Sequence, residues 1–264
     1  MTGIVAGNAP PGITTPEPGV RAITVDDISA ALSDGLRDFR AAPAFGLLIG
    51  AVYAIAGNVL FWVAASFDFL FLAYPLAAGF ALVAPFAAVG IYETSRRLAA
   101  GGDVSIGALA GSVPAHARRE LGYMALVTAF GLIGWIYAAG FVYALFFGLR
   151  PVDYTDIVSA VVSTPRGVAF LITGNIIGAV MATVIFSVSV VAYPMLLDRD
   201  IDFVTAMITS IRSVFAAPMV MLGWGIFVGT MLAVAILPMF LGLIVVLPWL
   251  GHATWHLYRR TVAA

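Results

Sequence analysis

The sequence lacks cysteine altogether and carries little charge. Without Cys the chain has no disulfide, no thiolate metal site and no haem attached through a CxxCH motif. Lysine is also absent, so all 13 basic residues are arginine, and charged residues make up only 10% of the chain. The formal net charge of -1 argues against nucleic acid as a partner. Apolar residues are abundant instead: 62% of the residues are hydrophobic, and the mean hydropathy is +1.03.

The hydrophobic residues gather in runs long enough to cross a bilayer as helix, which takes about 20 apolar residues. The sequence therefore predicts an all-α, polytopic membrane protein with one membrane domain over residues 23–260. Six transmembrane helices are expected, over residues 44–64, 69–92, 121–149, 167–197, 218–236 and 239–258. The last two share one apolar stretch, which is expected to turn near Leu237 and Pro238. Residues 1–22, rich in Pro and Gly, are predicted to form a disordered tail.

Two amphipathic segments are predicted to form helices on the cytoplasmic side. In residues 24–40 the spacing of Thr24 and Asp27 resembles a capping box. This helix either lies on the membrane surface or packs under the bundle. In residues 198–217, Asp202 is a candidate N-cap, Phe215 is expected on the apolar side and Ser213 on the polar side.

The distribution of arginine predicts the orientation of the spans in the membrane. Eleven of them fall in the two terminal segments and in the loops after the second and fourth spans, and two, Arg150 and Arg166, fall on the other side. Positive residues are retained in the cytoplasm, so both termini are predicted to be cytoplasmic.

Each amphipathic segment leads into a span in the same way. An Arg stands six residues before a Pro in both, as Arg37 and Pro43 and as Arg212 and Pro218, and the second and sixth spans both end in an Arg pair. Either an old duplication in parallel orientation or convergence on common residue preferences accounts for this pattern. If the duplication is real, Glu93 corresponds to His256, and the two are expected to face each other.

Few residues are candidates for chemistry. His252 and His256 lie four apart and project from one helical face, as a metal-binding pair does. No third ligand is near in sequence, so the pair is interpreted as part of an interfacial belt with Trp255, and no metal or other cofactor is expected. An enzyme acting on lipid would need a polar cluster at the interface, and the candidates for it are Glu93, Asp198, Arg199, His252 and His256. Glu93 is otherwise explained as a helix-surface partner of the following arginines.

Two amides, Asn58 and Asn175, fall inside predicted spans. Such amides usually bond to a neighbouring helix, although a substrate path also uses them.

Several motifs resemble those of the bacterial integral-membrane family called domain of unknown function 2189. They are DGLRDFR at 34–40, LAAGF at 76–80, YETSRR at 92–97, YPMLLDRD at 193–200, SIRSVFAAP at 210–218 and LPWLGHATWHLYR at 247–259. The resemblance implies a six-span protein of the bacterial inner membrane without an established activity. Some members carry the label cytochrome c oxidase subunit I, but three His are too few for a haem–copper core.

The function expected from the sequence is therefore that of a non-enzymatic scaffold or accessory protein. Its expected partners are the lipid bilayer and other integral membrane proteins, with respiratory complex subunits as one candidate class. A small-solute transporter or channel is the alternative. A polar cavity beside Asn58 or Asn175 would favour the alternative, and an apolar groove open to lipid would favour the scaffold.

Overall fold

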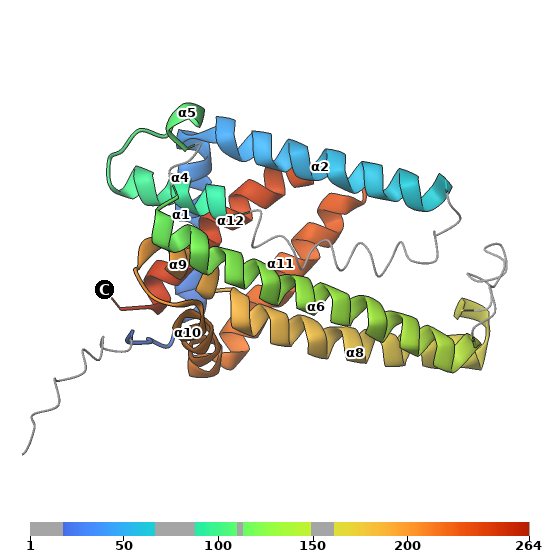
Figure 1. Ribbon diagram of the computed structural model, residues 1–264. Coiled ribbons are helices and arrows are strands. Elements are labelled where there is room, and N and C mark those ends of the chain that lie inside the picture. The colour runs from blue at the N-terminus through green and yellow to red at the C-terminus, as the bar shows by residue number, and fades with distance from the viewer. Residues whose placement is uncertain (1–17, 67–87, 110–112, 149–160, 264) are drawn as a thin grey trace, which may run out of the picture.

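The computed structural model describes residues 18–66, 88–109, 113–148 and 161–263, and this part of the chain is helical (Figure 1). Its elements are α1 (Val25–Ala41), α2 (Pro43–Ser66), α4 (Val89–Ala99), α5 (Ile106–Leu109), α6 (Ala115–Phe147), α8 (Pro165–Ser189), α9 (Ala192–Asp198), α10 (Phe203–Ala216), α11 (Pro218–Ile236) and α12 (Leu243–Thr261). Within these ranges the extended backbone pairs only in one bridge, between Val20 and Val262. The all-α class predicted from the sequence is confirmed.

Four stretches of the described chain are long and apolar enough to cross a membrane: Pro43–Ser66, Ala115–Phe147, Pro165–Asp198 and Pro218–Ile236. They overlap the predicted spans 44–64, 121–149, 167–197 and 218–236. The predicted span 69–92 falls outside the described residues except for its last five. The predicted span 239–258 is occupied by α12, whose second half carries His and Arg and which is not among the four. By length and composition, the described part of the chain thus holds four candidate spans, and the count of six stays a prediction.

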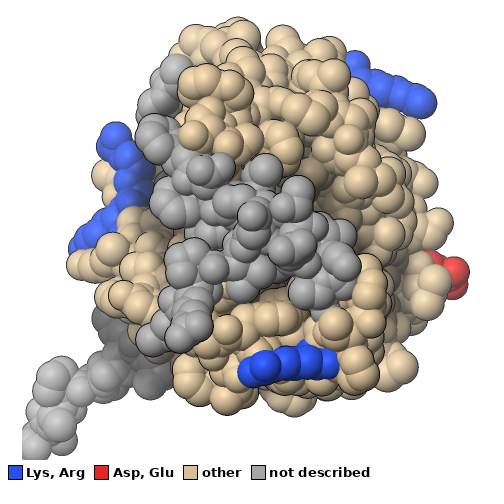
Figure 2. Space-filling view, turned by 90° about the vertical axis from the view of Figure 1, so that its right-hand side faces the viewer, with Lys and Arg blue, Asp and Glu red and all other residues tan. Residues whose placement is uncertain are grey.

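The remaining helices gather at one end of the spans. In Figure 1, α1, α4, α9, α10 and the C-terminal half of α12 form a cluster from which α2, α6 and α8 extend to the other end. We call this cluster the polar cap. Figure 2 looks at the end opposite to the cap, where charged residues appear only around the rim. Among the described arginines, Arg166 at the start of α8 is the one at this far end.

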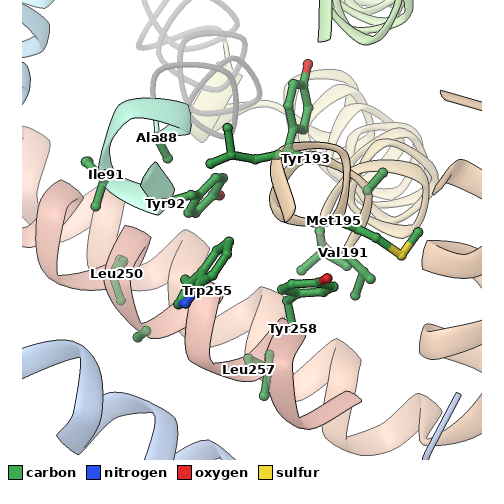
Figure 3. Close-up of a cluster of buried hydrophobic side chains, with 14 of the residues drawn as sticks. Ala88, Ile91, Tyr92, Val191, Tyr193, Met195, Leu250, Trp255, Leu257 and Tyr258 are labelled. Atoms are coloured by element: carbon green, nitrogen blue, oxygen red, sulfur yellow. The ribbon is translucent and has the colours of Figure 1, made fainter. Parts of the chain in front are cut away.

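The interior of the polar cap is apolar and closely packed. Side chains from α4, α9 and α12 interlock there, and Figure 3 shows Tyr92, Met195, Trp255 and Tyr258 among them. Trp255 and Tyr258 are buried within the protein. The interpretation of this part of α12 as a belt facing lipid headgroups is therefore wrong, because α12 is enclosed by other helices of the cap.

Helix α1 packs along α12 and is held close to it by a glycine. A Cβ added at Gly35 would lie 2.5 Å from the backbone nitrogen of Ala253, so a larger residue would push the two helices apart. The predicted capping box at its start is confirmed, since the Thr24 hydroxyl accepts from Asp27 N and the Asp27 carboxylate accepts from Thr24 N. Trp249 Nε1 also donates to Leu32 O across this interface.

The N-terminal residues of the described chain lie against its C-terminal end. Arg21 N donates to Thr261 O at 2.8 Å, and Ala263 N donates to Gly19 O at 2.9 Å. Residues 18–22, which were predicted to belong to a disordered tail, are therefore placed against the cap.

Helix α10 begins as predicted, and its inward side mixes hydroxyl and apolar residues. The Asp202 side chain accepts from Thr205 N and caps the helix. Thr209 and Ser213 are buried together with Ala206 and Val214, while Phe215 is 76% exposed, so the inward side of α10 holds residues from both of the predicted sides. The hydroxyls tolerate burial because each donates to the carbonyl four residues earlier, Thr209 to Thr205 O and Ser213 to Thr209 O.

Candidate functional site: a buried polar cluster in the cap

Four polar side chains meet between α1, α4 and α12. Asp38 Oδ2 lies 2.8 Å from Ser95 Oγ and 2.7 Å from His256 Nε2. Ser95 Oγ lies 2.7 Å from His252 Nδ1. Ser95 and His252 are fully buried, and Asp38 nearly so. We call these four residues the Asp38 cluster.

The hydrogen-bond partners determine where the protons lie. An ionised carboxylate only accepts, so both Ser95 Oγ and His256 Nε2 donate to Asp38. The single hydroxyl proton of Ser95 is then used, and the oxygen accepts from His252, whose proton must be on Nδ1. His252 Nε2 is left as a buried acceptor that has no hydrogen-bond partner in the described part of the chain.

The Asp38 carboxylate is held in its charged form. Burial by itself raises the pKa of Asp38, but the hydrogen bonds from His256 and Ser95 outweigh it and keep the pKa below its ordinary value. A charged carboxylate with two donors is a strong link between helices. It connects α1 to both α4 and α12.

This arrangement differs from a nucleophilic triad. In a triad the carboxylate orients the histidine that activates the serine. Here Asp38 bonds to Ser95 itself and to His256, while His252 bonds to Ser95 alone. Ser95 is also fully buried, so a substrate carbonyl cannot reach its oxygen. The geometry favours a structural role for the cluster.

The other members of the predicted polar cluster form separate ion pairs. Glu93 is 1% exposed and accepts from Arg96 Nε and Arg97 Nε, both at 2.7 Å. Burial raises the pKa of Glu93, and the two arginines more than compensate, so that it lies below its ordinary value. The expected Glu93–His256 pair is not formed. The first turn of α4 packs against the middle of α12, with Ile91 against Gly251, but His256 takes Asp38 as its carboxylate.

Asp198 and Arg199 join α9 to the end of α12. Asp198 Oδ2 accepts from Tyr258 Oη at 2.8 Å and from Arg259 Nη1 at 2.7 Å. Arg199 Nε donates to Tyr258 Oη, and its Nη2 donates to Ala263 O. All five predicted residues thus lie in the cap, but they are divided among three networks and do not converge on one reacting centre.

The two amides have unlike surroundings. Asn58 Nδ2 donates to Met239 O at 2.7 Å, in the turn between α11 and α12. Met239 has a φ of 53°, an unfavourable value for a non-glycine residue, and the hydrogen bond from Asn58 in α2 holds this turn.

Asn175 Nδ2 donates to Leu171 O in its own helix. Asn175 lines a groove of about 360 Å³ between α6 and α8, whose other lining residues are apolar or aromatic, among them Trp135, Tyr143 and Phe170.

The described residues contain no group of three or more His, Cys, Asp or Glu side chains placed to hold a metal ion.

Asp38 and Ser95 were not among the residues singled out from the sequence. One signal was available for Asp38: it follows Ala31 and Gly35 at helical spacing on the side of α1 that is buried. An Asp at such a position requires a buried partner.

Apolar spans joined to a helical cap define the class of this protein, an integral membrane protein of the polytopic α-helical type. The family model described as "Predicted integral membrane protein (DUF2189)" matches residues 73–198, which confirms the resemblance seen in the sequence. No curated protein and no solved structure matches the chain.

Proposed function

We propose that the protein is a non-enzymatic accessory or scaffold protein, which binds another integral membrane protein through the outward face of α6. The observation that carries this proposal is a hydroxyl group on that face. Tyr137 is 76% exposed and lies about ten residues before Phe147, the last residue of α6. At 1.5 Å per residue this places it about 15 Å inside the helix end, near the middle of a hydrocarbon core about 30 Å thick.

A phenolic hydroxyl in hydrocarbon lacks the hydrogen-bond partners that water provides. Tyr side chains buried elsewhere nearly always find such a partner. Tyr137 has no hydrogen bond to the described part of the chain. A neighbouring protein helix can offer an acceptor at this depth, whereas lipid tails cannot.

The surroundings of Tyr137 suit a helical partner. A stripe along the same face of α6 carries exposed large apolar side chains: Leu126, Phe130, Ile133, Phe141 and Leu145. Of the 18-residue apolar stretch of α6, only 11% is buried within the chain. The corresponding stretch of Pro165–Asp198 is 28% buried. Aromatic residues of this kind dominate the energetics of interfaces.

The apolar groove beside Asn175 also supports the scaffold over the transporter. A solute path across the membrane needs polar groups along its walls. The groove between α6 and α8 has one amide, and that amide bonds to its own helix. The enrichment of arginine at the cap supports a cytoplasmic position for the cap and for both chain ends.

The test is photo-cross-linking in the native membrane. A photoreactive residue placed at Phe130 or Phe141 is expected to form an adduct with one integral membrane protein, while the same residue at Ile55 of α2 or Ile176 of α8, also exposed, is expected to label lipid. Tyr137→Phe keeps the apolar surface and removes the hydroxyl. It is expected to weaken the complex about three-fold, from about 0.6 kcal/mol per interhelical hydrogen bond.

Two results would contradict the proposal. The first is labelling of lipid alone from all four positions. The second is an adduct between two copies of this chain, which would make the α6 face a site of self-association.

A further inference from the structure

The outward face of α10 carries large apolar side chains around one exposed arginine, Arg212, although the helix belongs to the polar cap. Val204, Ile208 and Phe215 are 44%, 50% and 76% exposed, and they follow one another at helical spacing. The stripe continues to Met219 in the first turn of α11, which is 83% exposed. A run of exposed large apolar residues of this kind marks a surface that contacts lipid or another protein.

The connection to α11 determines the depth of this face. Only Ala217 separates the end of α10 from Pro218, where an apolar span of 19 residues begins. Phe215 therefore lies within three residues of the point at which the chain enters the hydrocarbon. In Figure 1, α10 is seen nearly along its axis while α6 and α8 run across the page, so α10 lies crosswise to these spans. A helix with this direction and depth lies in the plane of the membrane interface.

Helix α1 provides an internal comparison. It too is separated from a span by a single alanine, and the backbone angles match: φ -140° and ψ 66° at Ala42, φ -146° and ψ 65° at Ala217. Along its outward side, however, α1 exposes polar residues, among them Ser29, Ser33 and Arg37. Both helices expose an arginine six residues before the proline of the span, Arg37 and Arg212. Beside it α1 exposes serines and α10 exposes large apolar residues, which suits water at α1 and acyl chains at α10.

We propose that α10 is a membrane-surface helix that inserts Val204, Ile208 and Phe215 into the lipid beneath the headgroups, on the side of the bilayer that carries the cap. The exposure of Val204, Ile208 and Phe215 follows from this position, because lipid covers them. The inward side of α10 combines the buried Ala206 and Val214 with hydroxyls that have partners there, since Thr209 and Ser213 donate to their own helix and Ser210 Oγ accepts from Val191 N. The occupant of this face is phospholipid, and the binding of α6 to a partner does not depend on it.

The absence of cysteine from the chain makes a direct measurement simple. Single cysteines at positions 208 and 215 of the full chain are labelled with bimane in vesicles of phosphatidylcholine and phosphatidylglycerol. Matched controls carry the label at Ser29 and Ser33, which are exposed on α1. All four side chains point away from the core, so labelling leaves the packing intact.

Quenching by doxyl-labelled lipid is expected to be roughly two-fold stronger at positions 208 and 215 than at 29 and 33, and quenching by aqueous iodide is expected to show the reverse order. Equal access of iodide to all four positions would overturn the proposal, because it would place the α10 face in water. Weak quenching by both reagents at 208 and 215 would also overturn it, because a protein surface would then cover the face.

Discussion

Replacing Asp38 removes the acceptor that joins three helices of the cap. Its Oδ2 atom receives Ser95 Oγ at 2.8 Å and His256 Nε2 at 2.7 Å, and the residue is 6% exposed. In Asp38→Asn the amide oxygen can occupy the Oδ2 position and keep both bonds, but without the charge. In Asp38→Ala both donors lose their acceptor, and His256 is left against a small cavity.

The expected losses follow from the hydrogen bonds. A bond to a charged group contributes roughly 1.5–3 kcal/mol and a neutral one roughly 0.5–1.5 kcal/mol, so the Asn variant is expected to lose about 2 kcal/mol over two bonds. The Ala variant is expected to lose about 3–5 kcal/mol, because two donors are each left without an acceptor at roughly 1–3 kcal/mol. The matched control is Asp34→Asn, one turn earlier on α1. Asp34 pairs with Arg260 at 2.5 Å where both side chains are partly exposed, so its loss is expected to stay below about 1 kcal/mol.

The assay is unfolding of the purified full chain by sodium dodecyl sulfate in mixed micelles, followed by tryptophan fluorescence. Trp249 lies at the interface of α1 with α12 and reports on their separation. The reasoning would be refuted if Asp38→Asn and Asp34→Asn lost the same free energy of unfolding. It would also be refuted if Asp38→Ala lost no more than Asp38→Asn.

Two further predictions concern the same cap. Gly35→Ala is expected to destabilise the protein by about 1–3 kcal/mol, since the new Cβ meets the backbone of Ala253 at 2.5 Å. In the control Gly140→Ala the new Cβ meets nothing within 4 Å, so this variant is expected to be neutral or stabilising by up to about 1 kcal/mol. Equal unfolding free energies for the two variants would contradict this. The pKa of Glu93 is lower in the folded protein than its ordinary value of 4.5, so its contribution to stability is present above that value and is lost as the pH falls below it. Measured between about pH 6 and about pH 3, the unfolding midpoint is expected to fall less steeply in Glu93→Gln than in the parent chain, and identical slopes would argue against the buried ion pair.

Local signals in the sequence were sufficient for much of the secondary structure. The predicted span 218–236 coincides with α11, because Pro218 suits the first turn of a helix and the apolar run ends before Pro238. The capping residues Thr24 and Asp202 were identified for the same reason: an N-cap acts on backbone groups two or three residues away. Such interactions depend on neighbours in sequence and can be read there.

The sequence by itself therefore determined the class of the protein, the position of most described helices and the side of α12 from which His252 and His256 project. Only the tertiary structure decided which carboxylate His256 meets. Spacing within one helix says which residues share a face, but the partner of that face comes from how closely another helix approaches, and here Gly35 brings α1 and its Asp38 against α12. The same holds for α10. Helical spacing separated two sides of the segment, and only its packing against α8 and α9 decided that Val214 lies inside and Phe215 outside.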